Sequence, residues 1–165
     1  MAWTLPLRQI RDHIGSMSMT DSAPMPHASA LDQAVPARLK RAGLRPTRQR
    51  LALASLLFEG GHRHVTAEQL HGEAGTSAIK VSLATIYNTL HQFTTAGLLR
   101  EVVIEPGRSY FDTNIDDHHH FYVEGSGQLL DIPGDSVSLA CLPTPPAGTA
   151  ISRVDVIIRV GPARS

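Results

Sequence analysis

The spacing of apolar residues changes at Gly97, from a helical period before it to a strand-like pattern after it. Ser82 is suited to cap a helix, and the apolar residues that follow recur every three or four positions, as on the buried face of a helix: Leu83, Ile86, Leu90 and Phe93. Residues 99–104 are rich in β-branched side chains and predict a strand. Residues 105–108 predict a turn, with proline second and glycine third, so residues 109–112 are expected to return as the partner strand.

Further helices are predicted upstream from residues that commonly begin or end a helix. Pro36 is expected to open the first, which ends near Gly43. Thr47 is expected to cap the second, which terminates at Gly60. Residues 66–69 have the pattern of a capping box at the start of a third. Helices followed by a β-hairpin are the order of a winged helix-turn-helix, so an α+β fold is predicted.

The composition divides the chain into three predicted regions: a flexible tail at 1–35, a winged-helix DNA-binding domain at 36–113, and a small α/β dimerisation and sensing domain at 114–165. The tail is rich in Ser, Ala, Pro and Met, and Met17, Met19 or Met25 is an alternative start. In the last region, residues 118–123 and 128–132 are expected to pair around a glycine-rich turn. A final strand is expected at 154–160.

Basic residues are concentrated in the helical half. Residues 36–100 contain nine Lys and Arg against three Asp and Glu, whereas the rest of the chain contains six against twelve. This asymmetry is typical of a nucleic-acid-binding domain beside a sensor domain. Cys141 is the only cysteine, which excludes an intramolecular disulfide and a structural zinc site of four cysteines, and fits a reducing cytoplasm. No apolar run approaches the length that spans a bilayer, so no membrane contact is expected.

The helix after Ser82 is the candidate for reading DNA bases. With its apolar residues turned inward, the outward side chains are short or hydrogen-bonding: Ala84, Thr85, Tyr87, Asn88 and His91. Such side chains can reach base edges in a major groove, and the helix N-terminus suits a phosphate. Arg108, at the tip of the hairpin, is placed to reach the DNA backbone or the minor groove. The alternative is an ordinary amphipathic helix with a solvated polar face, and the charge asymmetry favours the DNA interpretation.

Three consecutive histidines, at 118–120, are the second candidate site. In a strand, alternate side chains share a face, so His118 and His120 point together and His119 points away. Two imidazoles in this arrangement can bind one metal ion. Asp112 and Asp131 would add oxygen ligands, and His64 could reach across from the helical half. This mixed set suits Fe(II), Mn(II) or Zn(II); the alternative is a polar, solvated loop before a strand.

Three segments, 43–50, 64–70 and 82–90, resemble the winged helix of the ferric uptake regulator family, and the similarity extends over about residues 39–132. The resemblance implies a transcription regulator rather than an enzyme, which binds operator DNA as a homodimer. It places the family's base-contacting tyrosine at Tyr87 and its minor-groove basic residue at Arg45, and the DNA-contacting set is expected to be Arg45, Ser82, Thr85, Tyr87, Asn88 and Arg108. It places the regulatory metal site at His64, Asp112, His118, His120 and Asp131.

The chain also departs from the family's usual pattern. Residues 123–126 replace its Cys-x-x-Cys, so the structural zinc site is expected to be absent. Asp117 and His119 stand in reversed order for its second metal site, and the prolines of 143–146 interrupt the region of its long dimerisation helix. These departures resemble the iron response regulator branch, which has an Asp-Ile-Pro after the histidines, as at 131–133 here.

Resemblance to that branch implies control of iron homeostasis through haem or iron. Haem would bind at His118, His119 and His120, and a haem donor protein is a possible partner. A Zn(II)- or Mn(II)-responsive regulator of the same family is the nearest alternative. A metallohydrolase is a third hypothesis, for which Glu124 is the only nearby general base. A metal chaperone would not need the basic helical half.

Overall fold

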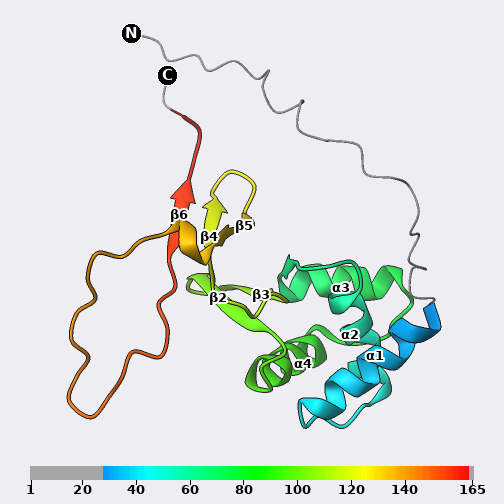
Figure 1. Ribbon diagram of the computed structural model, residues 1–165. Coiled ribbons are helices and arrows are strands. Elements are labelled where there is room, and N and C mark those ends of the chain that lie inside the picture. The colour runs from blue at the N-terminus through cyan, green and yellow to red at the C-terminus, as the bar shows by residue number, and fades with distance from the viewer. Residues whose placement is uncertain (1–27, 164–165) are drawn as a thin grey trace, which may run out of the picture.

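Four helices gather at one end of the molecule, as Figure 1 shows for the computed structural model, which describes the backbone of residues 28–163 and the side chains of residues 34–163. They are α1 (Ala28–Arg41), α2 (Arg48–Phe58), α3 (Ala67–Thr76) and α4 (Leu83–Thr95). The predicted caps are confirmed. Thr47 and Ser82 accept hydrogen bonds from backbone N–H groups of the first turns of α2 and α4, and Thr66 forms a capping box with Gln69.

The prediction that Pro36 opens the first helix is wrong. α1 begins at Ala28 and contains Pro36 in its interior, where a proline lacks the N–H donor and crowds the preceding turn. Burial offsets that cost, because Val35 and Leu39 lie one turn apart and are both buried against the helical core. The predicted tail at 1–35 lies largely outside the described residues.

The helices enclose one apolar core. Its fully buried members include a residue from every helix and one from the hairpin: Leu39, Leu53, Leu70, Phe93 and Phe111. α4 buries Ile86, Leu90 and Phe93 as predicted, whereas Leu83 is only partly buried at the edge of the core. The polar face of α4 is therefore left outside.

An antiparallel sheet completes the winged helix. Its strands are β1 (His64–Val65), β2 (Arg100–Glu105) and β3 (Arg108–Asp112), in the order β1-β3-β2. The predicted turn is confirmed, since Gly107 has a φ of 81°, the left-handed value that the third position of a type II turn requires. β1 pairs with β3 so that His64 lies opposite Asp112.

A second sheet follows, with strands β4 (His118–Val123), β5 (Gln128–Pro133) and β6 (Ile157–Val160) in the order β5-β4-β6. The β4–β5 hairpin is antiparallel, as predicted, and β6 runs parallel to β4. The final strand begins at Ile157, not at Val154 as expected, because Asp155 is paired with Arg100 ahead of the ladder. Between η1 (Gly134–Ser136) and β6 there is no helix or strand, in line with the proline-rich sequence there.

The two sheets are joined by a second apolar cluster. Val102, Ile104 and Tyr110 of the hairpin pack against Tyr122 and Leu129 of β4 and β5. This packing directs the inner face of the second sheet toward the winged helix. Among the described helices, none is long and apolar enough to cross a membrane.

Candidate metal centre and DNA-contacting surface

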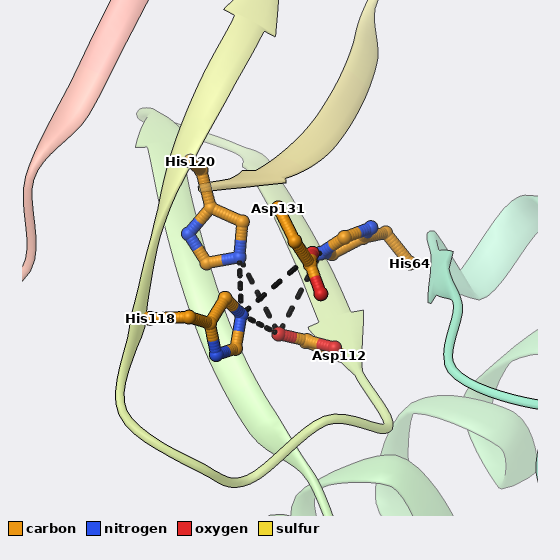
Figure 2. Close-up of side chains that lie close together, drawn as sticks. All are labelled: His64, Asp112, His118, His120 and Asp131. Carbon is orange, nitrogen blue, oxygen red and sulfur yellow. Dashed lines mark hydrogen bonds and ion pairs between the residues drawn. The ribbon is translucent and has the colours of Figure 1, made fainter. Parts of the chain in front are cut away.

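Five side chains that can bind a metal converge where the two sheets meet: His64, Asp112, His118, His120 and Asp131. One ligand atom from each lies within 4.8 Å of all the others. Figure 2 shows the imidazoles and carboxylates turned toward a common centre. These are the five residues predicted from the sequence, and the structure brings all of them together.

Strand register accounts for this convergence. His64 and Asp112 are partners across β1 and β3, and His120 and Asp131 are partners across β4 and β5. Partners in an antiparallel pair point to the same face of the sheet. His118 joins His120 by alternation along β4, so the winged helix supplies two side chains and the second sheet supplies three.

Nitrogen and oxygen atoms in the cluster lie at or near hydrogen-bonding distance. Nε2 of His118 is 2.8 Å from Oδ2 of Asp112 and 3.0 Å from Nε2 of His120. Nε2 of His120 is 3.4 Å from the same Asp112 oxygen. Nε2 of His64 is 2.9 Å from Oδ1 of Asp131 and 3.5 Å from Oδ2 of Asp112. Three imidazole nitrogens and two carboxylates therefore surround one small volume.

The centre of the cluster is closed to solvent. Asp112 and His120 are fully buried and His118 is 5% exposed, whereas Asp131 forms the open side. Burial raises the pKa of Asp112. Hydrogen bonding to the imidazole of His120 and the nearby imidazole of His64 lower it by more, so the pKa lies below its usual range. A buried, ionised carboxylate is costly unless a positive charge lies beside it.

The tautomer of His118 favours a cation at this place. Nδ1 of His118 lies 2.8 Å from the carbonyl oxygen of Asp116, which can only accept, and 3.4 Å from the guanidinium of Arg100, which can only donate, so the shorter contact favours the ring proton on Nδ1. Nε2 then carries a lone pair and faces a second acceptor, the Asp112 carboxylate, at 2.8 Å. A cation between them would satisfy both atoms, and a carbonyl behind the ring is a common second partner of metal-binding histidines.

His64 gives an independent indication. Its Nε2 is buried and has no hydrogen-bond partner, although an Asp131 oxygen lies 2.9 Å away, because the two groups are not aligned for a hydrogen bond. A nitrogen that faces carboxylates without bonding to them is suited to share a metal ion with them. The donors present therefore fit a divalent cation of the Fe(II), Mn(II) or Zn(II) class.

Two supporting residues were missed from the sequence. Asn114 donates from its backbone N–H to Asp112 Oδ1 at 2.8 Å and from its side chain to Asp131 Oδ2 at 3.0 Å. Arg100, counted with the DNA-facing basic residues, is buried; it donates to the carbonyl of His118 and pairs with Asp155. Alternation with Val102 and Ile104 places Arg100 on the inner face of β2, and that spacing was the available signal.

His119 lies apart from the other histidines. It is on the opposite face of β4 and lines a hollow of about 610 Å³ with Leu139, Leu142, Arg153 and the acids Asp117 and Asp135, a hollow that His118 also borders. The predicted haem set of His118, His119 and His120 is thus divided between two faces of one strand. Glu124, the base of the hydrolase hypothesis, is also outside the five-residue cluster and lies 3.9 Å from Arg159.

The predicted DNA-contacting residues lie on α4, on the loop before α2 and on the hairpin. Asn88 and Arg45 are exposed. Arg50 donates to the carbonyl of Arg45 at 2.9 Å and to the side chain of Gln92 of α4, so it ties the Arg45 loop to that helix. Ser82 and Thr85 bond to each other at 2.9 Å at the start of α4.

Two of these side chains have partners within the protein. The hydroxyl of Tyr87 donates to Glu68 of α3 at 2.7 Å, which lowers the pKa of Glu68. Arg108, half-exposed at the hairpin tip, donates to the hydroxyl of Tyr122 at 2.8 Å and lies 3.3 Å from the carboxylate of Glu105. Contact with DNA would require Arg108 to exchange this partner for a phosphate.

Comparisons with known proteins agree with this architecture. A sequence model described as the ferric uptake regulator family matches residues 41–140. The ferric uptake regulation protein of Klebsiella pneumoniae is 34% identical over 102 residues, covering 61% of this chain and 66% of that protein. The peroxide-responsive repressor PerR of Staphylococcus aureus is 35% identical over 95 residues, which cover 58% of this chain and 64% of that protein. The chain thus spans just under two thirds of these relatives.

A structure of the ferric uptake regulator from Pseudomonas aeruginosa with manganese has a similar fold, with a TM-score of 0.60 and 22% identity over 79% of this chain and 98% of that one.

Proposed function

Because this chain belongs to the ferric uptake regulator family, we propose that it is a metal-responsive transcription regulator that binds operator DNA as a homodimer in the cytoplasm. Members of this family are transcription regulators and not enzymes. The observation that carries the proposal is the five-residue cluster, since its ligands come from both the winged helix and the second sheet. A cation bound there would connect the DNA-contacting half to the rest of the molecule.

The number and type of ligands favour Fe(II) or Mn(II). Structural and catalytic zinc sites usually have four ligands in a tetrahedron, and five protein donors exceed that number. Imidazole suits iron and carboxylate suits manganese, so the mixed set accommodates either ion. One of the two relatives reported above is named for iron uptake and the other for peroxide response. Because both match this chain at nearly equal identity, the choice of effector rests on the metal-binding side chains of the cluster. We propose iron as the physiological ion, with Mn(II) and Zn(II) as alternatives.

DNA recognition is proposed for the outer face of α4. Asn88 can pair with adenine through its amide, and Tyr87 can reach a base once it leaves Glu68. Arg45 is placed for the backbone or the minor groove. Two copies related by a two-fold axis would present two such helices to successive major grooves of a pseudo-palindromic site.

The test compares two nearby histidines, His64 of β1 and His62, which lies two residues before it. The protein is used to select a duplex from a random-sequence pool, and binding to that duplex is followed by fluorescence anisotropy while Fe(II) or Mn(II) is added without oxygen. We expect His64→Ala to weaken metal binding at least about 100-fold, the upper end of what losing an outer partner costs, and to remove the metal dependence of DNA binding. His62→Ala, which alters an exposed residue outside the cluster, should behave as wild type. DNA binding with the same metal dependence in both variants would refute the proposal.

A haem-responsive regulator is the second candidate, and one observation favours it. Nδ1 of His119 is buried without a hydrogen-bond partner, and the hollow beside it is lined by two leucines and Arg153 together with Asp117 and Asp135, so Arg153 is the one basic residue there to meet a ligand carboxylate. Under this proposal a haem donor protein would deliver the ligand. Haem added to His119→Ala should give no Soret shift, whereas His120→Ala should keep the shift and lose metal binding. A wild-type protein without any Soret shift would exclude haem as the effector.

A further inference from the structure

We propose that Arg100 is a positioning residue of the metal centre, which holds the main chain of His118 and, through Asp155, fastens the segment before β6 beside the cluster. Three parts of the chain meet at this guanidinium: β2 of the winged helix, β4 of the second sheet and the approach to β6. The proposal rests on the metal binding proposed above and adds a residue that supplies no ligand atom.

Arg100 carries a charge into the layer between the two sheets. It is only 6% exposed, and it alternates along β2 with Val102 and Ile104, which are buried in the apolar cluster that joins the sheets. A guanidinium keeps its charge in a protein, so its burial is costly unless its N–H groups have acceptors. The acceptors of Arg100 therefore indicate its role.

The first acceptor is the main chain of a metal-binding residue. Nη1 of Arg100 donates to the carbonyl oxygen of His118 at 3.1 Å. This carbonyl is on the edge of β4 that faces β6, because the N–H of His120, on the same edge, donates to the carbonyl of Val156. Since β6 pairs with β4 only from Ile157 onward, the guanidinium holds His118 where the ladder has not yet begun.

The second acceptor belongs to the end of the chain. Nη2 of Arg100 donates to Oδ1 of Asp155, which lies two residues before the first residue of β6. Arg153 donates from its Nε to the same oxygen at 2.8 Å and so holds the carboxylate from its own segment. Asp155 also compensates the charge of Arg100, which would otherwise repel a cation bound to His118. The ion pair thus allows a positive side chain to lie directly behind a metal-binding histidine.

Arg100 adjoins the cluster from the winged helix as well. It is the register partner of Asp112 across β2 and β3, so both side chains are on the inner face of that sheet. Arg100 therefore lies beside a ligand of its own sheet, Asp112, and bonds to a ligand of the other, His118. Contacts that orient metal ligands in this way typically contribute about 10- to 100-fold to metal affinity.

The test removes the guanidinium and keeps an unbranched side chain. We expect Arg100→Met to raise the dissociation constant for Mn(II) about 10- to 100-fold in isothermal titration calorimetry. The visible absorption of the Co(II)-loaded protein should also change, because the position of His118 around the ion changes. Arg159→Met is the matched control. Arg159 likewise joins β6 to β2, by donating to the carbonyl of Ile104 at 2.6 Å, four residues along β2 from Arg100. This variant should keep the wild-type affinity and spectrum.

Two further variants separate positioning from folding, and circular dichroism shows whether each is folded. Arg100→Lys keeps a donor for the His118 carbonyl and should recover part of the affinity that Arg100→Met loses. Asp155→Asn leaves Arg100 in place without its compensating charge, and should weaken Mn(II) binding about tenfold or more.

Wild-type affinity and spectrum in folded Arg100→Met, or an equal loss in Arg159→Met, would overturn the positioning role and leave the proposed function standing. If Arg100→Met does not fold, Asp155→Asn decides, and wild-type affinity in that variant overturns the proposal. A wild-type protein that binds neither Mn(II) nor Fe(II) would overturn the proposed function together with this inference.

Discussion

Asn114 determines how two carboxylates from different sheets face the metal cluster. Its backbone N–H and its side-chain amide hold Asp112 and Asp131, one oxygen each, and leave the other oxygen of each acid turned toward the histidines. Partners of this kind fix the orientation of metal ligands, and their loss typically lowers metal affinity about 10- to 100-fold.

Replacing Asn114 by Ala should therefore weaken binding of Fe(II) or Mn(II) about 10- to 100-fold, without removing a ligand. Anaerobic isothermal titration calorimetry measures this effect. Asn88→Ala is the matched control, because it removes the same amide from an exposed position of α4 that is remote from the cluster. It should leave metal affinity unchanged and weaken DNA binding. Equal metal affinity in Asn114→Ala and wild type would show that the carboxylates are held by other contacts.

At the DNA surface, Tyr87 and Arg45 should differ in the kind of binding energy they contribute. Tyr87→Ala should cost about 1–3 kcal/mol at the selected duplex and relax its sequence preference, because it removes a base contact. Arg45→Ala should weaken binding evenly across sequences and reduce the slope of log affinity against log salt by about one. Competition titrations at several salt concentrations distinguish the two effects. Loss of sequence preference in Arg45→Ala but not in Tyr87→Ala would reverse these roles.

The metal-binding side chains could be predicted from the sequence, but the residues that orient them by hydrogen bonds could not. A histidine or aspartate at strand spacing is a candidate ligand from its side chain alone, and His118 and His120 were assigned to one face by alternation. Asn114 lies in a short loop where an asparagine is ordinary. Its contacts with both Asp112 and Asp131 become visible only in the folded structure.

At the scale of elements, helix caps are where sequence and structure agree most closely. Thr66 is the clearest case, since both hydrogen bonds of its capping box are present, at 3.2 Å and 2.8 Å. α3 begins directly after β1, so this cap also fixes the end of the strand that carries His64.

Thr66→Ala should reduce the free energy of unfolding by about 1 kcal/mol, the usual effect of losing an N-cap. Urea denaturation of the metal-free protein measures the change. Thr144→Ala, an exposed substitution in the proline-rich connection between η1 and β6, is the control and should change stability by less than about 0.5 kcal/mol. A destabilisation of equal size in both variants would mean that the capping box contributes no stability of its own.

Element boundaries could not be predicted where a tertiary contact overrides a local rule. The chemistry of proline predicts Pro36 in the first turn of a helix. The helix nevertheless continues through Pro36, because Val35 and Leu39 on either side of it are buried. The run from Val154 is strand-forming by composition, but Asp155 is drawn to the buried Arg100 and the ladder starts at Ile157. In both cases the deciding partner is far away in sequence, and no local pattern indicates it.

At the scale of the whole molecule, the metal cluster lies on the boundary between two units of opposite charge. Basic residues predominate in the helical half and acidic residues elsewhere. His64 and Asp112 belong to the winged helix, and His118, His120 and Asp131 belong to the second sheet. A cation bound to all five residues would stabilise the arrangement in which the winged helix and the second sheet meet at the cluster. If DNA also binds one arrangement of these two parts more tightly than another, metal binding and DNA binding must be linked.

Linkage requires the two ligands to affect each other equally. If saturating Fe(II) changes the affinity for the selected duplex by some factor, saturating duplex should change the affinity for Fe(II) by the same factor, because both routes join the same two end states. Two anaerobic titrations measure this, one of duplex with and without metal and one of metal with and without duplex. His120→Ala, which removes a fully buried member of the cluster, should bring both factors to one. If metal binds tightly to the wild type but neither ligand changes the affinity for the other, the metal cluster does not influence DNA binding. That outcome would contradict the proposed regulation.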